Sequence, residues 1–328
     1  MLSRMLRLAV STLGLAFLVW SGTAGADQRF ILDSHIHAGH DNDWVQRLVS
    51  IYREHNAMAC VLTWMDDFEL IKKAAEDYPD VVIPYGRVDP DDPNAVREIE
   101  KFYQAGFVGI KFHSPEKNWD DPSYFQMYRL CEYLGLPMLF HTGITSRGMT
   151  DKPAKSSTMR MRPGYLDLVA RAFPRTMIQG AHFGNPFYDE AAEACRWNPN
   201  LFFDITGSTL HKLIKLDDLA RFKKILWWSA GEGEETAHTL KGGPDAFEHI
   251  VFGTDEQPEG LIGNIERFQK FLDANEVPER LRAKMWGLTI ARILDIDPET
   301  HQFRRPRPLP PGSHHIFEPG KPGGASDY

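Results

Sequence analysis

The sequence predicts a (β/α)₈ barrel, a TIM barrel, with an insertion between its seventh and eighth strands. Three observations support this prediction: eight short apolar runs, helical spacing between most of them, and one long interval late in the chain. The runs are rich in β-branched and aromatic residues, and they cover residues 30–37, 57–64, 81–88, 107–113, 137–142, 176–182, 201–205 and 250–254. Strands that alternate with helices form parallel sheets, and eight such units can close a barrel.

Helical patterns separate many of the expected strands, and they cover residues 67–78, 95–105, 122–134, 165–173 and 189–196. Asp121-Pro122 is a typical helix start, and Gly106 and Gly135 each follow an expected helix end. A doubly wound open sheet is the alternative, but no glycine-rich dinucleotide motif follows any of the strands. The interval 204–243 is too long for one crossover helix, so we expect an insertion over the barrel mouth there.

The two ends of the chain differ from this pattern. Residues 1–26 have the layout of a secretory signal peptide, with Arg4 and Arg7 before an apolar run and a small-residue cleavage site at 24–26. We therefore expect a secreted or periplasmic protein without a stable membrane span in its mature form; an uncleaved anchor helix is the alternative. The barrel domain is expected over 27–297, and the proline- and glycine-rich residues 298–328 predict an extended or disordered C-terminal arm.

The composition excludes several classes of protein. The 328 residues are 42% hydrophobic and 25% charged, which is typical of a folded soluble chain. The formal net charge of −8 argues against a nucleic-acid partner, because such proteins normally present a basic face. Cys60, Cys131 and Cys195 are widely spaced and odd in number, so neither a disulfide framework nor a cysteine zinc finger is expected.

Histidine and aspartate side chains end four of the expected strands. The first strand ends in a His-x-His pair, His35 and His37, which alternation places on one face. The fifth, sixth and eighth strands end near His141, His182 and Asp255. A lone His-x-His is more often a pair of hydrogen-bonded polar residues. Here, however, a histidine or an aspartate also ends the fifth, sixth and eighth strands, and this combination favours a metal site. Three imidazoles and a carboxylate suit one divalent ion, with Zn²⁺ preferred.

This set of strand ends resembles the amidohydrolase superfamily. More narrowly it is similar to the amidohydrolase-related branch, with aminocarboxymuconate semialdehyde decarboxylase, resorcylate-type decarboxylases and related lactonases and hydratases. The resemblance covers about residues 30–296, and residues 287–290 read Gly-Leu-Thr-Ile where the family usually has Gly-x-Asn-Ala. It implies that the metal ligands are His35, His37, His141 and Asp255, and that His182 is an acid–base residue beside the metal.

Basic side chains near these strand ends predict an anionic substrate. Lys111 and His113 share a face at the end of the fourth strand, and the resemblance implies an unmodified lysine facing the pocket there. The loop over residues 144–163 carries five basic residues, including Arg160 and Arg162, against one acidic residue. We expect these four side chains to bind a substrate carboxylate. The alternative is that the loop charges only offset acidic neighbours.

These inferences together predict an enzyme. A bound divalent ion lowers the pKa of water towards ~7 and polarises a carbonyl group. We therefore expect a metal-dependent hydrolase of a small anionic ester, lactone or amide, with His182 and Asp255 as catalytic groups. A non-oxidative decarboxylase of a small aromatic carboxylic acid is the alternative, and a non-catalytic metal-binding module is a third hypothesis. A homodimeric assembly stays open.

Overall fold

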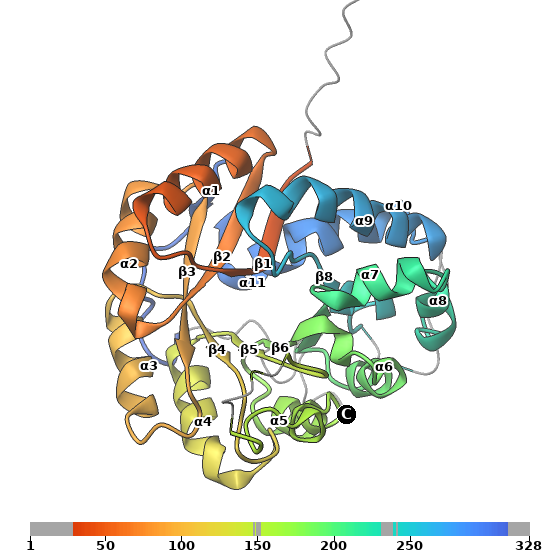
Figure 1. Cartoon of the computed structure of the whole chain (residues 1–328), viewed down its shortest axis with the longest axis horizontal. Helices are drawn as coiled ribbons and strands as arrows, with labels where there is room; N and C mark the ends of the chain where they lie inside the picture. Colours follow the sequence, from red (N-terminus) through yellow and green to blue (C-terminus); the bar gives the residue numbers. More distant parts are fainter. Residues whose placement is uncertain (1–28, 147, 149–151, 231–238, 241, 314–328) are drawn as a thin grey trace, which may run out of the picture.

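The computed structural model describes residues 29–313 except 147, 149–151, 231–238 and 241 (Figure 1). The expected signal peptide, residues 1–26, and the last part of the expected C-terminal arm, residues 314–328, lie outside the described residues.

Eight parallel strands form one sheet in chain order at the centre of the molecule (Figure 1). The first and last strands approach each other where the Ser34 backbone N–H donates to the Phe252 carbonyl at 3.0 Å, so the sheet is a nearly closed barrel. This architecture confirms the predicted (β/α)₈ barrel. The strands are β1 (Ile31–His37), β2 (Ala57–Thr63), β3 (Val82–Val88), β4 (Gly109–Phe112), β5 (Met138–Phe140), β6 (Ile178–Gly180), β7 (Leu201–Asp204) and β8 (Ile250–Val251).

Helices surround the strands (Figure 1). Each of the five helical patterns corresponds to one of α2 to α6, with small shifts at the ends, whereas the sequence analysis did not predict α1 and α9. The α-helices between β1 and β7 are α1 (Asn42–Glu54), α2 (Phe68–Asp77), α3 (Ala95–Gln104), α4 (Phe125–Leu134), α5 (Tyr165–Ala172) and α6 (Tyr188–Arg196). After β7 follow α7 (Ser208–Lys215), α8 (Arg221–Ile225), α9 (Leu261–Ala274), α10 (Glu279–Ala283) and α11 (Thr289–Leu294).

The ends of α4 show why these residues form a helix. The Asp121 side chain accepts a hydrogen bond from the Ser123 N–H, as expected of an N-cap, and the first turn is the 3₁₀ helix η2 (Pro122–Tyr124). Gly135 ends α4 with a φ of 70°, a left-handed conformation that glycine adopts at little cost. The chain then enters β5 directly.

Apolar side chains fill the inside of the barrel. Gly287, just before α11, lies so close to β1 that a Cβ atom there would be 2.7 Å from the Leu32 nitrogen, so only glycine fits. α11 and the short strand β9 (Ile296–Asp297) close the base of the barrel. The inside is therefore a packed core, and polar groups collect at the carboxyl ends of the strands. This interior core includes Leu32, Met58, Leu62, Ile83, Tyr85, Leu139, Met177, Phe202, Val251 and Ile290.

The segments outside the eight βα units also have a defined place. β10 (Gln302–Phe303) pairs with β9 in an antiparallel hairpin, and beyond it the carbonyl of buried Leu309 accepts from the Tyr103 hydroxyl. The interval between β7 and β8 contains α7 and α8.

All three cysteines are buried and free. Within the described ranges, none of the helices combines the length and the apolar composition of a membrane span.

Candidate metal centre

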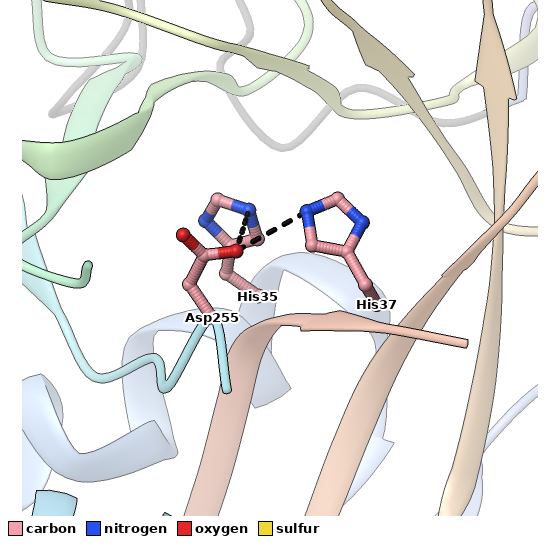
Figure 2. A group of neighbouring side chains, drawn as sticks. All are labelled: His35, His37 and Asp255. Carbon is pink, nitrogen blue, oxygen red and sulfur yellow. Dashed lines mark ion pairs between the residues drawn. The ribbon is translucent and has the colours of Figure 1, made fainter. Parts of the chain in front are cut away.

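Three of the predicted ligands come together at the carboxyl end of the barrel (Figure 2). Asp255 Oδ1 lies 3.2 Å from Nε2 of His37 and 3.5 Å from Nε2 of His35. One ligand atom of each residue lies within 4.8 Å of the other two. Two imidazole nitrogens and a carboxylate oxygen are a donor set typical of catalytic zinc sites, which keep a further position open.

Asp204, at the end of β7, orients the His35 ring. Its Oδ2 lies 3.0 Å from His35 Nδ1, so the Nδ1–H donates to Asp204 and the Nε2 lone pair faces Asp255. Gln179 Nε2 and the backbone N–H of His182 donate to the same carboxylate. Burial alone would raise the pKa of Asp204, but the electrostatic interaction and hydrogen bond with His35 outweigh it and lower this pKa below its usual range. This role was not predicted from the sequence, although an aspartate at the end of the seventh strand is a visible signal.

A second missed carboxylate, Asp33, holds the backbone on which the ligands stand. Its Oδ1 accepts from the backbone N–H groups of His35 and Thr254, and its Oδ2 accepts from the Tyr52 and Thr254 hydroxyls. Burial is the largest influence on Asp33 and raises its pKa, while these hydrogen bonds oppose the shift. Asp33 therefore ties the His-x-His strand to the residue before Asp255.

His182 lies beside this group, but not at the end of a strand. β6 ends at Gly180, and His182 has a left-handed backbone with φ 63° in the short 3₁₀ turn η4 (Ala181–Gly184). The predicted strand 176–182 is therefore too long at its end, because this turn re-aims the side chain. Asp255 also has a positive φ, 52°. Such strained conformations of non-glycine residues concentrate at functional sites.

The tautomer of His182 follows from its hydrogen bonds. Thr206 Oγ1 donates to Asp204 Oδ1 at 2.6 Å, so it accepts from His182 Nδ1–H at 2.9 Å. The unprotonated Nε2 then faces Asp255, 3.8 Å from its Oδ2. Burial lowers the pKa of His182 to about 4. The residue is therefore a neutral imidazole with a free lone pair in the cavity, which suits a general base.

His35, His37 and Asp255 line a cavity of about 270 Å³. His141, predicted as a fourth ligand, lines this cavity, and its ring centroid lies 4.8 Å from that of His182. Its Nε2 is 3.2 Å from the Ile144 carbonyl, and it does not belong to the three-residue group. The lining residues are His35, His37, His113, His141, Ile144, Thr145, Ser146, His182, Asn185, Gly207, Ser208 and Asp255.

Two of the predicted substrate-binding residues, Lys111 in β4 and His113 directly after it, have different environments. His113 lines the cavity, and burial lowers its pKa well below its usual value. Lys111 is fully buried next to the ligands, with its Nζ 3.4 Å from His35 Nε2. Burial lowers the pKa of Lys111 to about 7, so its charge is sensitive to pH in the neutral range.

The basic loop is largely paired with acidic residues. Arg162 donates hydrogen bonds to both carboxylate oxygens of Glu190 and stacks on Phe187, and it does not line the cavity. Lys152 and Lys155 form ion pairs with acidic residues of other segments. Arg160 lies half-buried in the 3₁₀ helix η3 (Thr158–Met161) and also does not line the cavity. These pairings favour the interpretation that the loop charges offset acidic neighbours, and a substrate role of either arginine stays a prediction.

A comparison with known families decides what this barrel is. An amidohydrolase family model matches residues 53–296. The chain belongs to the amidohydrolase family. The matched segment of this amidohydrolase includes His141, His182 and Asp255, whereas the His-x-His strand precedes it.

Solved structures of other proteins share the fold. An uncharacterized TIM-barrel protein from Bordetella bronchiseptica is 16% identical, with a TM-score of 0.58 over 80% of this chain and 98% of its own. A putative amidohydrolase from Staphylococcus aureus is 14% identical, with a TM-score of 0.51 over 81% of this chain and 99% of its own. A search of curated proteins found no match.

The residues present in this amidohydrolase fit a divalent ion. The Asp204 contact presents the unprotonated His35 Nε2 to the site, and the His37 Nε2 faces the same Asp255 oxygen. An amidohydrolase usually binds a metal, and His35, His37 and Asp255 could hold one here.

Proposed function

We propose that this amidohydrolase is a metal-dependent hydrolase that acts on a small anionic ester, lactone or amide. The observation that carries the proposal is the position of neutral His182, whose free Nε2 faces Asp255 beside the ligand atoms of His35 and His37. An acid–base group next to a metal-ligating carboxylate, in one open cavity, is what hydrolysis of a carbonyl substrate requires.

Each side chain then has a defined task. A bound divalent ion, which we propose is Zn²⁺, would supply an activated water and polarise the substrate carbonyl. His35, His37 and Asp255 would hold it, and His141 is the candidate for a fourth contact from the cavity wall. His182 takes up a proton at Nε2 and returns it to the leaving group, while Thr206 and Asp204 keep the ring in place through Nδ1.

The cavity supports a small, polar substrate. Its volume of about 270 Å³ lies below the usual range of drug-sized pockets, roughly 300–1,000 Å³. Histidine, serine, threonine and asparagine side chains make up much of its wall, whereas apolar side chains are few. We further propose that the protein is exported, on the basis of the signal-peptide layout of residues 1–26.

The test begins with the metal content of the purified protein, followed by a panel of small carboxylate-bearing esters, lactones and amides and of aromatic carboxylic acids. Acid release without CO₂, lost when His35 and His37 are both changed to Ala, supports the proposal. Release of CO₂ instead assigns the decarboxylase chemistry. Metal binding without turnover of any compound would contradict both and leave a binding module. His211→Ala, an exposed histidine on α7, is the matched control.

A further inference from the structure

Arg87 and Trp64 stand at the barrel mouth on the strands next to the metal-ligating group. Ile83 and Tyr85 of β3 belong to the interior core, so Arg87, two residues later, points to the same inner side. Trp64, directly after β2, follows Leu62 of the same core in the same way. Both side chains therefore lie one layer above the apolar filling, at the carboxyl ends of their strands, and beside the cavity rather than in its lining.

The strand register brings Arg87 close to the site. Arg87 pairs with Lys111 of β4, whose Nζ lies 3.4 Å from the ligand atom of His35. Burial lowers the pKa of Arg87 to about 10, and the negative charge of Asp255 opposes this shift. Burial has the largest effect on the pKa of His37 and lowers it, and the Arg87 charge lowers it further. The guanidinium thus shares the electrostatic environment of the proposed metal ligands.

The guanidinium stacks on an aromatic ring but has no anionic partner. Its Cζ lies 4.2 Å from the centroid of the Trp64 ring. Its buried Nε has no hydrogen-bond partner, and no carboxylate of the described residues forms an ion pair with it. A partly buried cation that lacks an ion-pair partner is costly, and stacking on a ring offsets only part of that cost.

Other arginines of the chain show how unusual this arrangement is. Within the described residues, every other arginine that lies over an aromatic ring also donates a hydrogen bond to a carboxylate, amide or backbone oxygen. These arginines are Arg29, Arg53, Arg162, Arg196, Arg221 and Arg307. Arg87 alone among them keeps its donors unused, and it is the one at the mouth of the barrel.

We propose that Arg87, held by Trp64, forms a subsite that binds a carboxylate group of the substrate beside the metal centre. This inference rests on the proposed function and deepens it, because it assigns recognition of the anionic group to residues of β2 and β3, independently of the basic loop after β5. A planar guanidinium binds a carboxylate through two parallel hydrogen bonds, and stacking on Trp64 holds the fork in one orientation. The substrate would then carry a carboxylate in addition to the carbonyl group that reacts.

Carboxylate binding tests this subsite without any need for turnover. Malonate and glutarate are titrated by calorimetry into the purified protein, as isolated and after removal of metal with a chelator. Arg87→Met should weaken binding about tenfold to a hundredfold in both samples, the usual loss for a charged hydrogen-bonding partner. Arg87→Lys, which keeps the charge but not the fork, should give an intermediate loss. Arg196→Met is the matched control, since it removes a guanidinium that also stacks on a tryptophan, Trp227, but lies on α6.

A melting experiment separates this role from a structural one. Without carboxylate, Arg87→Met should unfold at the same temperature as the parent protein or above it, because the substitution removes an uncompensated buried charge. A clearly lower melting temperature with unchanged carboxylate affinity would overturn the inference. So would a parent protein that binds neither dicarboxylate, or binds both as Arg87→Met does. An inactive protein that still shows the Arg87-dependent binding would contradict the proposed hydrolase activity and not this subsite.

Discussion

Asp204 Oδ2 lies 3.0 Å from Nδ1 of His35, and this contact sets the direction in which His35 presents its other nitrogen. Both residues are almost completely buried, so the ring cannot turn without breaking a hydrogen bond that water cannot replace. The Asp204 carboxylate thus holds the His35 ring through Nδ1, so that Nε2 is directed at the candidate metal site. Partners of metal-ligating histidines commonly have this role.

Asp204→Asn should therefore lower the affinity for metal roughly 10- to 100-fold, the usual effect of losing such a partner. Asparagine keeps the shape of the side chain but removes the charge that stabilises the correct His35 tautomer. Competition with a chelator of known affinity measures the change. Asp167→Asn, which alters a carboxylate paired with Arg171 on α5, serves as control. An unchanged affinity for metal in Asp204→Asn would show that the contact is not needed for binding.

His35→Ala or His37→Ala should abolish stoichiometric metal binding while the barrel stays folded, because each change removes one of the donors around Asp255. Elemental analysis and circular dichroism provide the two measurements. The same analysis of His141→Ala tests the fourth ligand that the resemblance implies. Full retention of one tightly bound ion in the His35, His37 double variant would mean that the ligand assignment is wrong.

His182→Ala should reduce turnover by roughly 10²–10⁴-fold, the range expected for an acid–base residue, without loss of metal. Thr206→Val removes the hydroxyl that accepts from Nδ1 and should cause a smaller loss of turnover, since it frees the ring but leaves Nε2 in place. Turnover number and metal content are measured on the same preparations. A His182→Ala protein without metal would place this histidine among the ligands instead.

Arg160→Gln should raise KM for an anionic substrate, with an effect that weakens as salt is added, if the loop contributes to binding. Arg162→Gln is expected to leave KM unchanged, because Glu190 already occupies that guanidinium. Steady-state kinetics at two ionic strengths test both variants. Equal KM values for Arg160→Gln and the parent protein would assign the loop to surface charge balance alone.

Buried His249 should make the fold sensitive to acid. Burial lowers its pKa to about 4 from an ordinary value near 6.5, and its Nδ1 lies 2.6 Å from the Leu201 carbonyl. A base with a lowered folded-state pKa contributes stability above pH ~6.5, and this contribution is lost as pH falls towards 4. The loss should reach about 2 kcal/mol near pH 5 by linkage.

The control for this acid sensitivity is His249→Asn, which keeps a donor to the carbonyl but does not titrate. Urea unfolding at pH 7 and pH 5 should show a smaller drop in stability for the variant than for the parent protein. Identical drops in the two proteins would assign the acid sensitivity to other groups.

The eight strands could be predicted because each one shows its own local signal. β2 reads Ala-Met-Ala-Cys-Val-Leu-Thr, and such apolar runs between turn residues indicate buried parallel strands without any knowledge of their partners. The ends of β6 and β8 were placed too late: β6 ends at Gly180, before the left-handed turn that contains His182, and β8 ends at Val251, before the segment that leads to Asp255. Nothing in the residue pattern marks that change of direction.

The candidate ligands could also be predicted, whereas their supporting residues could not. His35 and His37 form a recognisable His-x-His motif, and His182 and Asp255 each follow an apolar run. Asp33 and Thr206 look ordinary in the sequence, and Asp204 is marked only by its place at the end of the seventh strand. The importance of all three depends on which residues contact them across the barrel.

The sequence alone determined the barrel, the identity of the residues at its mouth and the family to which the chain belongs, because periodicity and strand-end chemistry are local properties. Only the tertiary structure decided which of those residues meet. It brought His35, His37 and Asp255 within reach of one ion, paired Arg162 with Glu190, and left the buried Arg87 Nε without a hydrogen-bond partner. Distances between side chains from different strands depend on register, twist and packing of the whole barrel, and no single segment carries that information.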